Sequence, residues 1–284
     1  MKAPAFDYVR PATLDDALAL LARHGEDARP IAGGQSLLPA LNLRLSQPKI
    51  LIDIGRLPEL GGITRDGHGL RLGALTRHAD LLTSPAVAEA APLLARAAAH
   101  IAHPAIRSRG TLGGSLANAD PAAELPACAL ALGARLIAQG AARGRRTIEA
   151  EHFFTGLFAT ALAPDELLVA VELDPPEPGD AAGFAELARR SGDYAMVGLA
   201  AHRGRKDGLR LAYFSAGPVP VLARHAGAAL DRDPADLATA IAALPRDLAP
   251  HDDLQASAAT RLHLAGVLLR RVMNELAPPR AQAA

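Results

Sequence analysis

Two glycine-containing segments are the parts of this 284-residue sequence whose residue types and spacing indicate ligand binding. They are Ala32-Gly33-Gly34-Gln35-Ser36 and Thr111-Leu112-Gly113-Gly114-Ser115. Consecutive glycines let the backbone turn sharply, so that successive amide N–H groups can converge on phosphate oxygens. A helix that begins just after such a loop adds its N-terminal partial positive charge, and Ser36, Thr111 and Ser115 add hydroxyl donors. Two such loops suit a pyrophosphate, which has two phosphates to hold.

Each glycine pair alone has a simpler explanation, which is a plain turn. Neither segment fits Gly-x-Gly-x-x-Gly, which argues against a Rossmann nucleotide site. The sequence also lacks the Gly-x-x-x-x-Gly-Lys-Ser/Thr pattern of a P-loop NTPase. The prediction of a phosphate site therefore depends on the two segments acting together.

The residues around the first segment predict a small α/β unit. Thr13 can cap a helix that begins at Leu14, carries two acids in its first turn and stops at Gly25. A strand at 29–32, the glycine loop, one or two helical turns within 37–45 and a strand at 50–54 complete the unit.

A second α/β block surrounds the second segment, and a C-terminal module follows it. The block has predicted strands at 70–75, 135–138 and 166–173 and helices at 87–101 and 122–132. Three prolines and a glycine within 174–180 mark a domain boundary. Beyond it, we predict paired strands at 197–201 and 209–215, a turn at 204–208, and helices at 234–244 and 260–276. The predicted domains are 1–175, with subdomains at about 1–56 and 57–175, and 180–284.

Composition narrows the class of protein. Thirty basic and thirty acidic residues cancel, and no basic patch indicates nucleic-acid binding. We interpret Arg143, Arg145 and Arg146 as a solvated hairpin tip. The one cysteine, Cys128, lies in an apolar run and is expected to be a small buried residue. Because there is no apolar run of membrane-spanning length and no apolar signal core, we expect a cytoplasmic protein without a membrane span.

Longer stretches around both glycine segments resemble the FAD-binding signatures of the medium subunit of aerobic carbon monoxide dehydrogenase and its relatives. These stretches are 29–39 and 106–122, and the segments 6–11 and 189–195 resemble the same family. The family also includes the flavin domain of xanthine dehydrogenase. The resemblance runs over nearly the whole chain with matching order and spacing.

The resemblance implies an α+β fold: a vanillyl-alcohol-oxidase (PCMH)-type FAD-binding domain of two α/β subdomains, then a C-terminal α+β domain. The loop 32–36 and the segment 111–115 would hold the pyrophosphate and ribityl region. Glu124 falls where the family often has an Asp that contacts the flavin nucleotide. The residues that the resemblance assigns to cofactor binding are Arg29, Ile31, Ala32, Gly33, Gly34, Gln35, Ser36, Leu37, Ile101, Ala102, Ile106, Gly110, Thr111, Gly113, Gly114, Ser115, Asn118, Asp120, Glu124, Leu168 and Tyr194.

Simpler explanations stand beside several of these assignments. Tyr194 matches an aromatic residue near the isoalloxazine ring, but it is also explained as an aromatic at the domain boundary. Arg107 and Arg109 would balance phosphate charge or pair with surface acids. His100 and His103 are three residues apart, and we interpret them as structural because a metal site needs more ligands.

By resemblance, the chain carries FAD in an electron-transfer subunit of a molybdenum hydroxylase. A large subunit with a molybdenum cofactor would oxidise the substrate, and a small subunit with two [2Fe–2S] clusters would pass electrons to this chain's FAD. Neither loop offers a matching His or Cys, so the FAD is expected to be non-covalent, and no residue of the chain is assigned as catalytic. The expected assembly is a dimer of heterotrimers that reduces a quinone, dioxygen or NAD. The alternatives are a stand-alone FAD-dependent oxidoreductase of the same fold and a flavin-free α/β scaffold.

Overall fold

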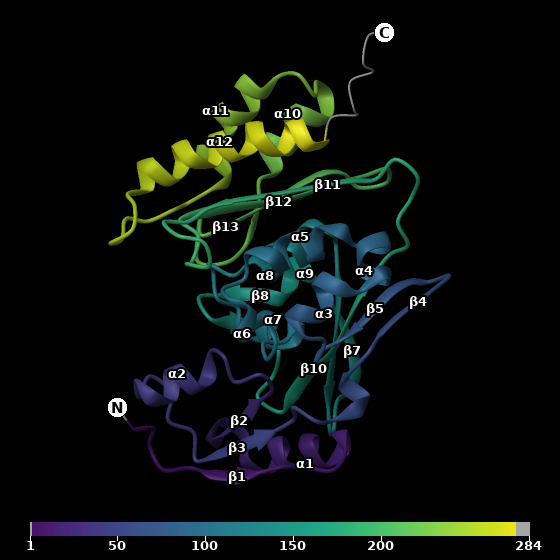
Figure 1. The fold of residues 1–284 in the computed structure, drawn as a ribbon, viewed down its shortest axis with the longest axis vertical. Coiled ribbons are helices and arrows are strands. Elements are labelled where there is room, and N and C mark those ends of the chain that lie inside the picture. Colours follow the sequence, from purple (N-terminus) through teal and green to yellow (C-terminus); the bar gives the residue numbers. More distant parts are fainter. Residues whose placement is uncertain (1, 277–284) are drawn as a thin grey trace.

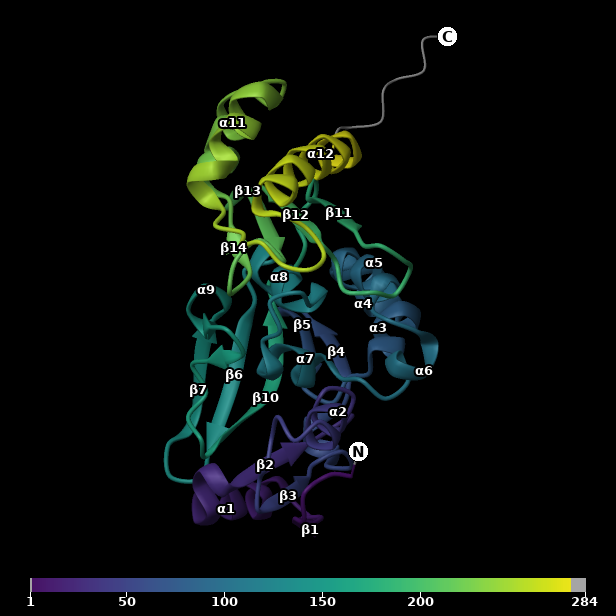
Figure 2. The same ribbon diagram turned by 90° about the vertical axis from the view of Figure 1, so that its left-hand side faces the viewer.

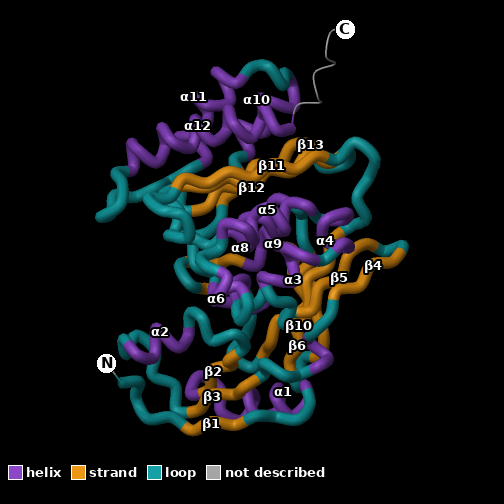
Figure 3. The backbone as a smooth tube through the Cα atoms, in the orientation of Figure 1, coloured by secondary structure: helices purple, strands orange, loops and turns teal. Residues whose placement is uncertain are grey.

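The computed structural model describes residues 2–276 as three sheets stacked along the long axis of the molecule (Figure 1). A small parallel sheet lies at one end, a five-stranded antiparallel sheet in the middle and a four-stranded antiparallel sheet at the other end. Most of the helices of the middle part lie between the two antiparallel sheets (Figure 3). A two-stranded hairpin, β8 (Phe154–Gly156) with β9 (Ala159–Thr160), completes the strands.

The N-terminal sheet has the order β1-β3-β2 and is parallel throughout. Its elements are β1 (Asp7–Val9), α1 (Leu14–His24), β2 (Ala28–Ile31), α2 (Leu37–Asn42) and β3 (Ile50–Asp53). Helix α1 buries Leu14, Ala17, Leu18 and Leu21, whose spacing places them on one helical face. The hydroxyl of Thr13 accepts from the amide of Asp16, and Gly25 ends the helix with a φ of 53°. The predicted helix, its cap and its stop are confirmed.

The middle sheet is antiparallel and has the order β4-β5-β10-β6-β7. Its strands are β4 (Ile63–Asp66), β5 (Gly69–Gly73), β6 (Arg135–Gly140), β7 (Gly144–Glu149) and β10 (Glu166–Leu173). The helices of this part are α3 (His78–Thr83), α4 (Pro85–Ala90), α5 (Pro92–His100), α6 (Pro104–Arg107), α7 (Leu112–Asn118), α8 (Glu124–Ala131) and α9 (Ala150–Phe153). The short 3-10 turns are Gly25–Asp27 and Pro58–Leu60.

The prediction of a single helix over 87–101 is wrong. The chain forms α4 and α5 instead, with Ala91 between them at φ −146° and ψ 58°. Pro92 explains the break, since it has no N–H to donate and disfavours helical geometry in the preceding residue. The apolar spacing of Leu93, Leu94, Ala97 and Ala98 is nevertheless helical, and α5 buries all four.

The interpretation of the basic segment as a solvated tip holds for Arg143 and is wrong for Arg146. The Arg143 side chain is 61% exposed at the hairpin. Arg146 lies on β7 and reaches over β6 to Glu166 of β10, where Nη2 is 2.7 Å from Oε2 of a fully buried carboxylate. Arg145 bonds Gln139 on the neighbouring strand at 2.7 Å. The arginines therefore stabilise the sheet edge.

The C-terminal sheet has the order β11-β12-β13-β14, antiparallel throughout. Its strands are β11 (Ala181–Leu187), β12 (Val197–Gly204), β13 (Gly208–Phe214) and β14 (Val221–Leu222), and its helices are α10 (Arg224–Arg232), α11 (Leu237–Asp247) and α12 (Ala258–Leu276). The predicted strand pair and its turn are confirmed, and both predicted helices exist with ends shifted by a few residues.

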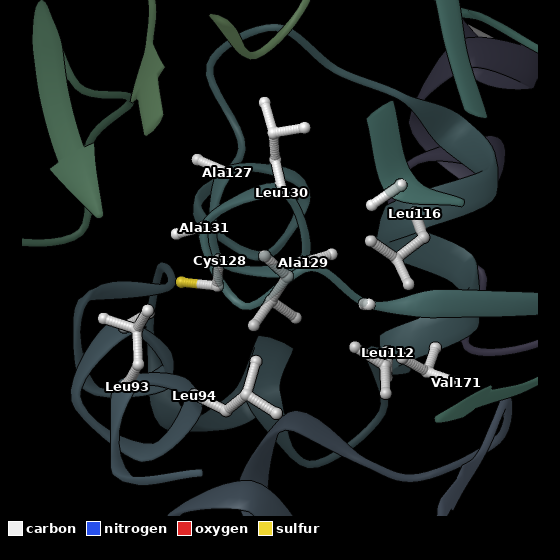
Figure 4. Packing of buried hydrophobic residues seen from close by; sticks show 14 of the residues in the cluster. Leu93, Leu94, Leu112, Leu116, Ala127, Cys128, Ala129, Leu130, Ala131 and Val171 are labelled. Carbon is white, nitrogen blue, oxygen red and sulfur yellow. The ribbon is translucent and has the colours of Figure 1, made fainter. Parts of the chain in front are cut away.

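Both faces of the C-terminal sheet are covered (Figure 2). Alternate residues such as Leu199 and Leu211 face the cluster formed with α10, α11 and α12, whereas Ala200 and Phe214 belong to the cluster that includes α5 and α8. Figure 4 shows α8 with leucines of α5 and α7 on either side, and Cys128 is fully buried there as expected. Helices α5 and α8 thus join the C-terminal sheet to the middle part of the molecule.

Candidate functional site

All of the residues that the resemblance assigns to cofactor binding line one pocket of about 750 Å³. They come from β2, the loop after it and the start of α2, from 101–124, from Leu168 of β10 and from Tyr194. Segments far apart in the sequence thus meet around one space, whose size is that of a small-molecule or cofactor site.

The first glycine loop presents a row of free backbone donors. Within the described part of the chain, the amides of Gly33, Gly34, Gln35 and Ser36 have no hydrogen-bond acceptor. Gly34 has a φ of 74°, the left-handed region that glycine adopts without strain, and α2 begins directly afterwards. Successive amides in such a turn form an anion-binding concavity. The geometry expected of a phosphate loop is present here.

The second segment is not the free loop that the sequence suggested. Gly113 and Gly114 lie in the first turn of α7, and Thr111 caps this helix by accepting from the Gly114 amide at 3.0 Å. The amides of Leu112, Gly113 and Ser115 also donate within the protein, to Thr76, Ala74 and Thr111 respectively. The prediction that both segments supply rows of free amides is therefore wrong for this one. Its glycines instead permit close packing.

The two segments meet at Gly33. A Cβ added to Gly33 would lie 2.1 Å from the carbonyl oxygen of Arg109, and one added to Gly113 would lie 2.5 Å from the Cβ of Ala74. Neither position has room for a larger residue unless backbone atoms move. The approach of the first loop to Arg109 therefore requires glycine at position 33, and the packing of α7 against Ala74 requires glycine at position 113.

The side chain of His78 supports the second segment, and no pattern in the sequence indicated this role. The side chain is 6% exposed, lines the pocket, and bonds the Thr111 carbonyl oxygen through Nε2 at 2.9 Å. Because a carbonyl oxygen only accepts, Nε2 carries the proton, and Nδ1 has no partner in residues 2–276. Burial lowers the pKa of His78 to about 4, so the ring is neutral at physiological pH.

The segment after α5 has an unusual backbone. Ala102 lines the pocket with a φ of 40°, a region that non-glycine residues rarely adopt. The Arg107 guanidinium holds this turn by donating to the carbonyls of Ile101 at 2.8 Å and Ala102 at 3.0 Å. Arg107 therefore pairs with backbone, and neither a phosphate nor a surface acid is needed to explain it.

Acidic side chains lie at another part of the wall. Burial raises the pKa of Asp120, and burial together with Glu186 raises the pKa of Glu124 to about 7. Tyr194 is 63% exposed and lines the same pocket. Burial and the nearby carboxylates of Asp120 and Glu124 raise the pKa of the Tyr194 phenol.

Strand β10 and the hairpin before it supply a wall that the sequence analysis largely missed. Leu168 is 4% exposed, and the β6–β10 register shifts between Leu168 and Ala170, as in a β-bulge. Phe158 also lines the pocket, is 57% exposed and has a φ of 52°. A turn between two very short strands has no apolar periodicity, so the sequence pattern could not place Phe158.

The two histidines considered as a pair lie in different elements. His100 ends α5, with Nδ1 3.3 Å from Oε1 of Glu186, and His103 precedes α6. Over residues 2–276, no group of three or more His, Cys, Asp or Glu side chains is arranged to hold a metal ion. No helix in that range is both long and apolar enough to cross a membrane.

Comparison with known proteins covers both parts of the chain. The model for the FAD binding domain in molybdopterin dehydrogenase matches residues 4–176, and that for the CO dehydrogenase flavoprotein C-terminal domain matches residues 182–276. The chain belongs to this molybdenum hydroxylase flavoprotein family. The family predicted from the sequence is therefore confirmed.

Individual relatives of this flavoprotein family match along nearly their whole length. The 6-hydroxypseudooxynicotine dehydrogenase complex subunit alpha of Paenarthrobacter nicotinovorans is 40% identical, over 96% of this chain and 95% of that protein. The carbon monoxide dehydrogenase medium chain of Hydrogenophaga pseudoflava is 37% identical, over 95% and 96%. A solved structure of carbon monoxide dehydrogenase from Hydrogenophaga pseudoflava superposes with a TM-score of 0.92 at 38% identity, over 97% and 98%. The predicted PCMH-type fold class is thus confirmed.

FAD is the cofactor of this flavoprotein family, and the pocket fits it. Four free amides at 33–36 form a cradle for phosphate oxygens, and Gly33 lets this cradle lie directly against the Arg109 carbonyl, where any side chain would clash. Buried apolar side chains such as Leu168, and carboxyl groups that can bond hydroxyls, line other parts of the wall. An apolar pocket with a few convergent polar groups is what a dinucleotide with an aromatic ring requires.

Proposed function

We propose that this chain is the FAD-carrying electron-transfer subunit of a molybdenum hydroxylase. It would take electrons from [2Fe–2S] clusters of a partner subunit and pass them to an external acceptor. The observation that carries the proposal is the single pocket, which gathers the free amides of 33–36 and the residues of 101–124 in a chain whose two parts both match the flavoprotein family.

The chain's own residues bind and orient the cofactor. Bound FAD supplies the redox chemistry, since it exchanges two electrons in total. In this proposal the amides of Gly33 to Ser36 hold the diphosphate, and the strained turn at Ala102, fixed by Arg107, shapes the wall beside it. Leu168 packs against the cofactor. The exposed aromatic side chains of Phe158 and Tyr194 line the pocket where electrons would enter or leave.

We also propose that the remaining assigned residues contact the cofactor and that the chain divides into two domains. The cofactor would be bound non-covalently by all the residues assigned above, which lie in a first domain at 1–175 except for Tyr194 of the second domain. The C-terminal domain at 180–284 would cover α5 and α8. The ends of the two family matches support this division.

The partners in this proposal are a large subunit with the molybdenum cofactor and a small subunit with two [2Fe–2S] clusters, assembled as a dimer of heterotrimers. Two relatives are named as subunits of larger enzymes: one is a dehydrogenase complex subunit and the other is a medium chain. Cys128 is fully buried and is the only cysteine, so this chain cannot hold a [2Fe–2S] cluster by itself. The clusters must therefore lie in another chain.

Purification of the tagged chain from cells that express its neighbouring genes tests the proposal. We expect a yellow complex with one FAD for each copy of this chain. Two partner chains should copurify, a larger one that contains molybdenum and a smaller one that contains iron. A yellow chain that never carries molybdenum or iron would instead indicate a stand-alone FAD-dependent oxidoreductase. A chain that binds no FAD under any condition would contradict both and leave the flavin-free scaffold.

A further inference from the structure

A cluster of partly buried acidic groups connects the pocket wall to the surface at the end of α5. Glu124 and Asp120 line the pocket. Glu186 of β11 has a side chain that is 6% exposed, and its Oε1 lies 3.3 Å from Nδ1 of His100, whose side chain is 45% exposed. The binding of phosphate by the glycine loop uses none of these groups.

Glu186 has an unmet hydrogen-bonding requirement. Its second carboxyl oxygen, Oε2, is buried and has no hydrogen-bond partner within residues 2–276. A buried carboxylate oxygen without a donor is costly, which favours an added proton in this cluster. Burial raises the pKa of Glu124 most, and among the neighbouring charges that of Glu186 raises it most.

The charges around Glu124 leave the cluster short of positive charge. The titratable groups that face it come from five separate segments of the chain: Asp120 before α8, Cys128 within α8, His100 of α5, Glu186 of β11 and Tyr194 after β11. His100, whose pKa is raised by its hydrogen bond to Glu186, is the one group in this set that can carry a positive charge, and burial keeps the Cys128 thiol protonated. Three carboxylates facing one imidazolium would carry a net negative charge in a buried place, so a proton is favoured there.

We propose that Glu124, Glu186 and His100 form a proton-binding site in the pocket wall, which takes up a proton when the dinucleotide enters the pocket. The inference rests on the proposed function, because it assumes that FAD is the ligand. A bound dinucleotide brings a negatively charged diphosphate and removes water from Glu124, and both effects favour the neutral carboxyl group. The proton comes from the bulk solvent and ends on the Glu124 carboxyl oxygen, and no electrons move in this step.

The protonated group gains a role that the carboxylate lacks. An ionised carboxylate only accepts hydrogen bonds, whereas a neutral one can also donate its O–H to an acceptor atom of the ligand. Without a ligand in the pocket, the pKa of Glu124 is about 7, so this carboxyl group is only partly protonated at neutral pH. Binding then raises this pKa and proton uptake follows by linkage. The affinity for FAD therefore falls as the pH rises above 7.

Calorimetry of FAD binding tests the site directly. The full-length chain, freed of flavin, is titrated with FAD at pH 7.5 in phosphate and in Tris, whose ionisation enthalpies differ. We expect the wild type to take up part of one proton, and the dissociation constant to rise between pH 7 and 9 by up to about tenfold per pH unit. We expect Glu124→Gln to bind FAD with no such uptake and with a flat pH profile.

A matched control is Glu89→Gln, a surface glutamate that pairs with Arg65 away from the pocket. This control should take up as many protons on FAD binding as the wild type does. Any protons that FAD itself binds are included equally in both measurements. Equal uptake by Glu124→Gln and the wild type would overturn the proton site while leaving FAD binding intact. Failure of the wild type to bind FAD would instead contradict the proposed function.

A second variant keeps the test decisive if Glu124→Gln does not fold. Glu186→Gln removes the neighbouring negative charge, so Glu124 should lose its proton at lower pH. The midpoint of the pH profile for FAD affinity should then move down relative to the wild type. A midpoint that stays in place in Glu186→Gln would overturn the coupling between the two acids.

Discussion

At the residue scale, Gly33 decides how closely the two pocket segments approach each other. An alanine at this position would place its Cβ 2.1 Å from the Arg109 carbonyl oxygen, so one of the segments must move. We expect Gly33→Ala to weaken FAD binding at least tenfold and to lower the free energy of unfolding by about 1–3 kcal/mol. Fluorescence titration with FAD and urea unfolding measure the two effects.

Gly67→Ala is the matched control for this substitution. A Cβ at Gly67 meets no atom within 4 Å, and its backbone lies outside the left-handed region. The control should bind FAD like the wild type and change stability by less than about 0.5 kcal/mol. If both variants bind FAD equally well, the close approach at Gly33 does not shape the pocket.

His78 makes stability depend on pH. Burial lowers its pKa to about 4, whereas in the unfolded chain it returns to 6.5. As the pH falls from 6.5 to 4, the unfolded state binds a proton that the folded state does not, so the folded state loses stability. The loss is at most about 1.4 kcal/mol per pH unit within this window, and none accrues above it.

Substitution of His78 by glutamine isolates this effect. The glutamine amide can donate to the Thr111 carbonyl as Nε2 does, and it does not titrate. In urea unfolding between pH 7 and 4, His78→Gln should lose less stability than the wild type. Parallel pH curves for the two proteins would show that protonation of His78 does not oppose folding.

At the element scale, the ion pair between β7 and β10 holds three strands together. Arg146 donates to both carboxyl oxygens of Glu166 at 2.7 Å and passes over β6 to do so. The Arg146 hydrogen bonds lower the pKa of this buried carboxyl. Since Arg146 is 42% exposed, water screens the pair, and we expect Arg146→Met to cost about 1–2 kcal/mol at pH 7.

The pH dependence and a neighbouring variant test this assignment. The ion pair contributes to the free energy of unfolding at pH values above the ordinary pKa of a glutamate. This contribution disappears as the pH falls through the lowered pKa of Glu166. The difference between the wild type and Arg146→Met should therefore shrink in acid. Arg145→Met removes the adjacent arginine, which bonds only Gln139, and should change stability by less than about 0.5 kcal/mol. Equal losses in both variants would contradict the special role of Arg146.

The sequence predicted elements best where local chemistry determines them. Thr13, the apolar face of α1 and Gly25 are close together in the chain, and the predicted helix is present. The glycine segments and the family resemblance brought together residues that do line one pocket. The break at Ala91 was also encoded locally, by Pro92, but the alanine-rich pattern outweighed it in the prediction.

What the sequence could not show depends on contacts between distant segments. Arg146 looked like a solvated residue because Glu166 joins it only through the strand order β10-β6-β7. The amides of 112–115 looked free because their acceptors include Thr76 and Ala74, on a different segment. His78 faces Thr111 for the same reason. No periodicity within either segment reports such pairings.

At the scale of the whole molecule, the C-terminal sheet and the FAD-binding part share one core. Phe214 of β13 and Cys128 of α8 belong to the same apolar cluster, and α8 begins at Glu124 in the pocket wall. A movement of the C-terminal sheet would therefore shift the helix that carries an acidic pocket residue. The packing of this sheet is part of what fixes the shape of the cofactor site.

Arg210 of β13 makes several polar contacts across this junction. It donates to the carbonyls of Leu130 at 2.8 Å and Ala131 at 3.1 Å, at the C-terminal end of α8, and to Glu151 at 2.8 Å. A cation at this end of a helix satisfies carbonyls that have no helical partner. The Arg210 side chain is 16% exposed, so we expect Arg210→Met to cost about 1.5–3 kcal/mol and to weaken FAD binding severalfold.

Arg224→Met separates this link from the charge of Glu151 alone. Arg224 pairs with the same carboxylate, but its side chain is 66% exposed and it makes no bond to α8. Its loss should cost less than about 1 kcal/mol and leave FAD affinity unchanged, as for an exposed ion pair. Urea unfolding and FAD titration of both variants decide the matter. If Arg210→Met loses stability but keeps full affinity for FAD, then α8 holds Glu124 in place without help from the C-terminal sheet.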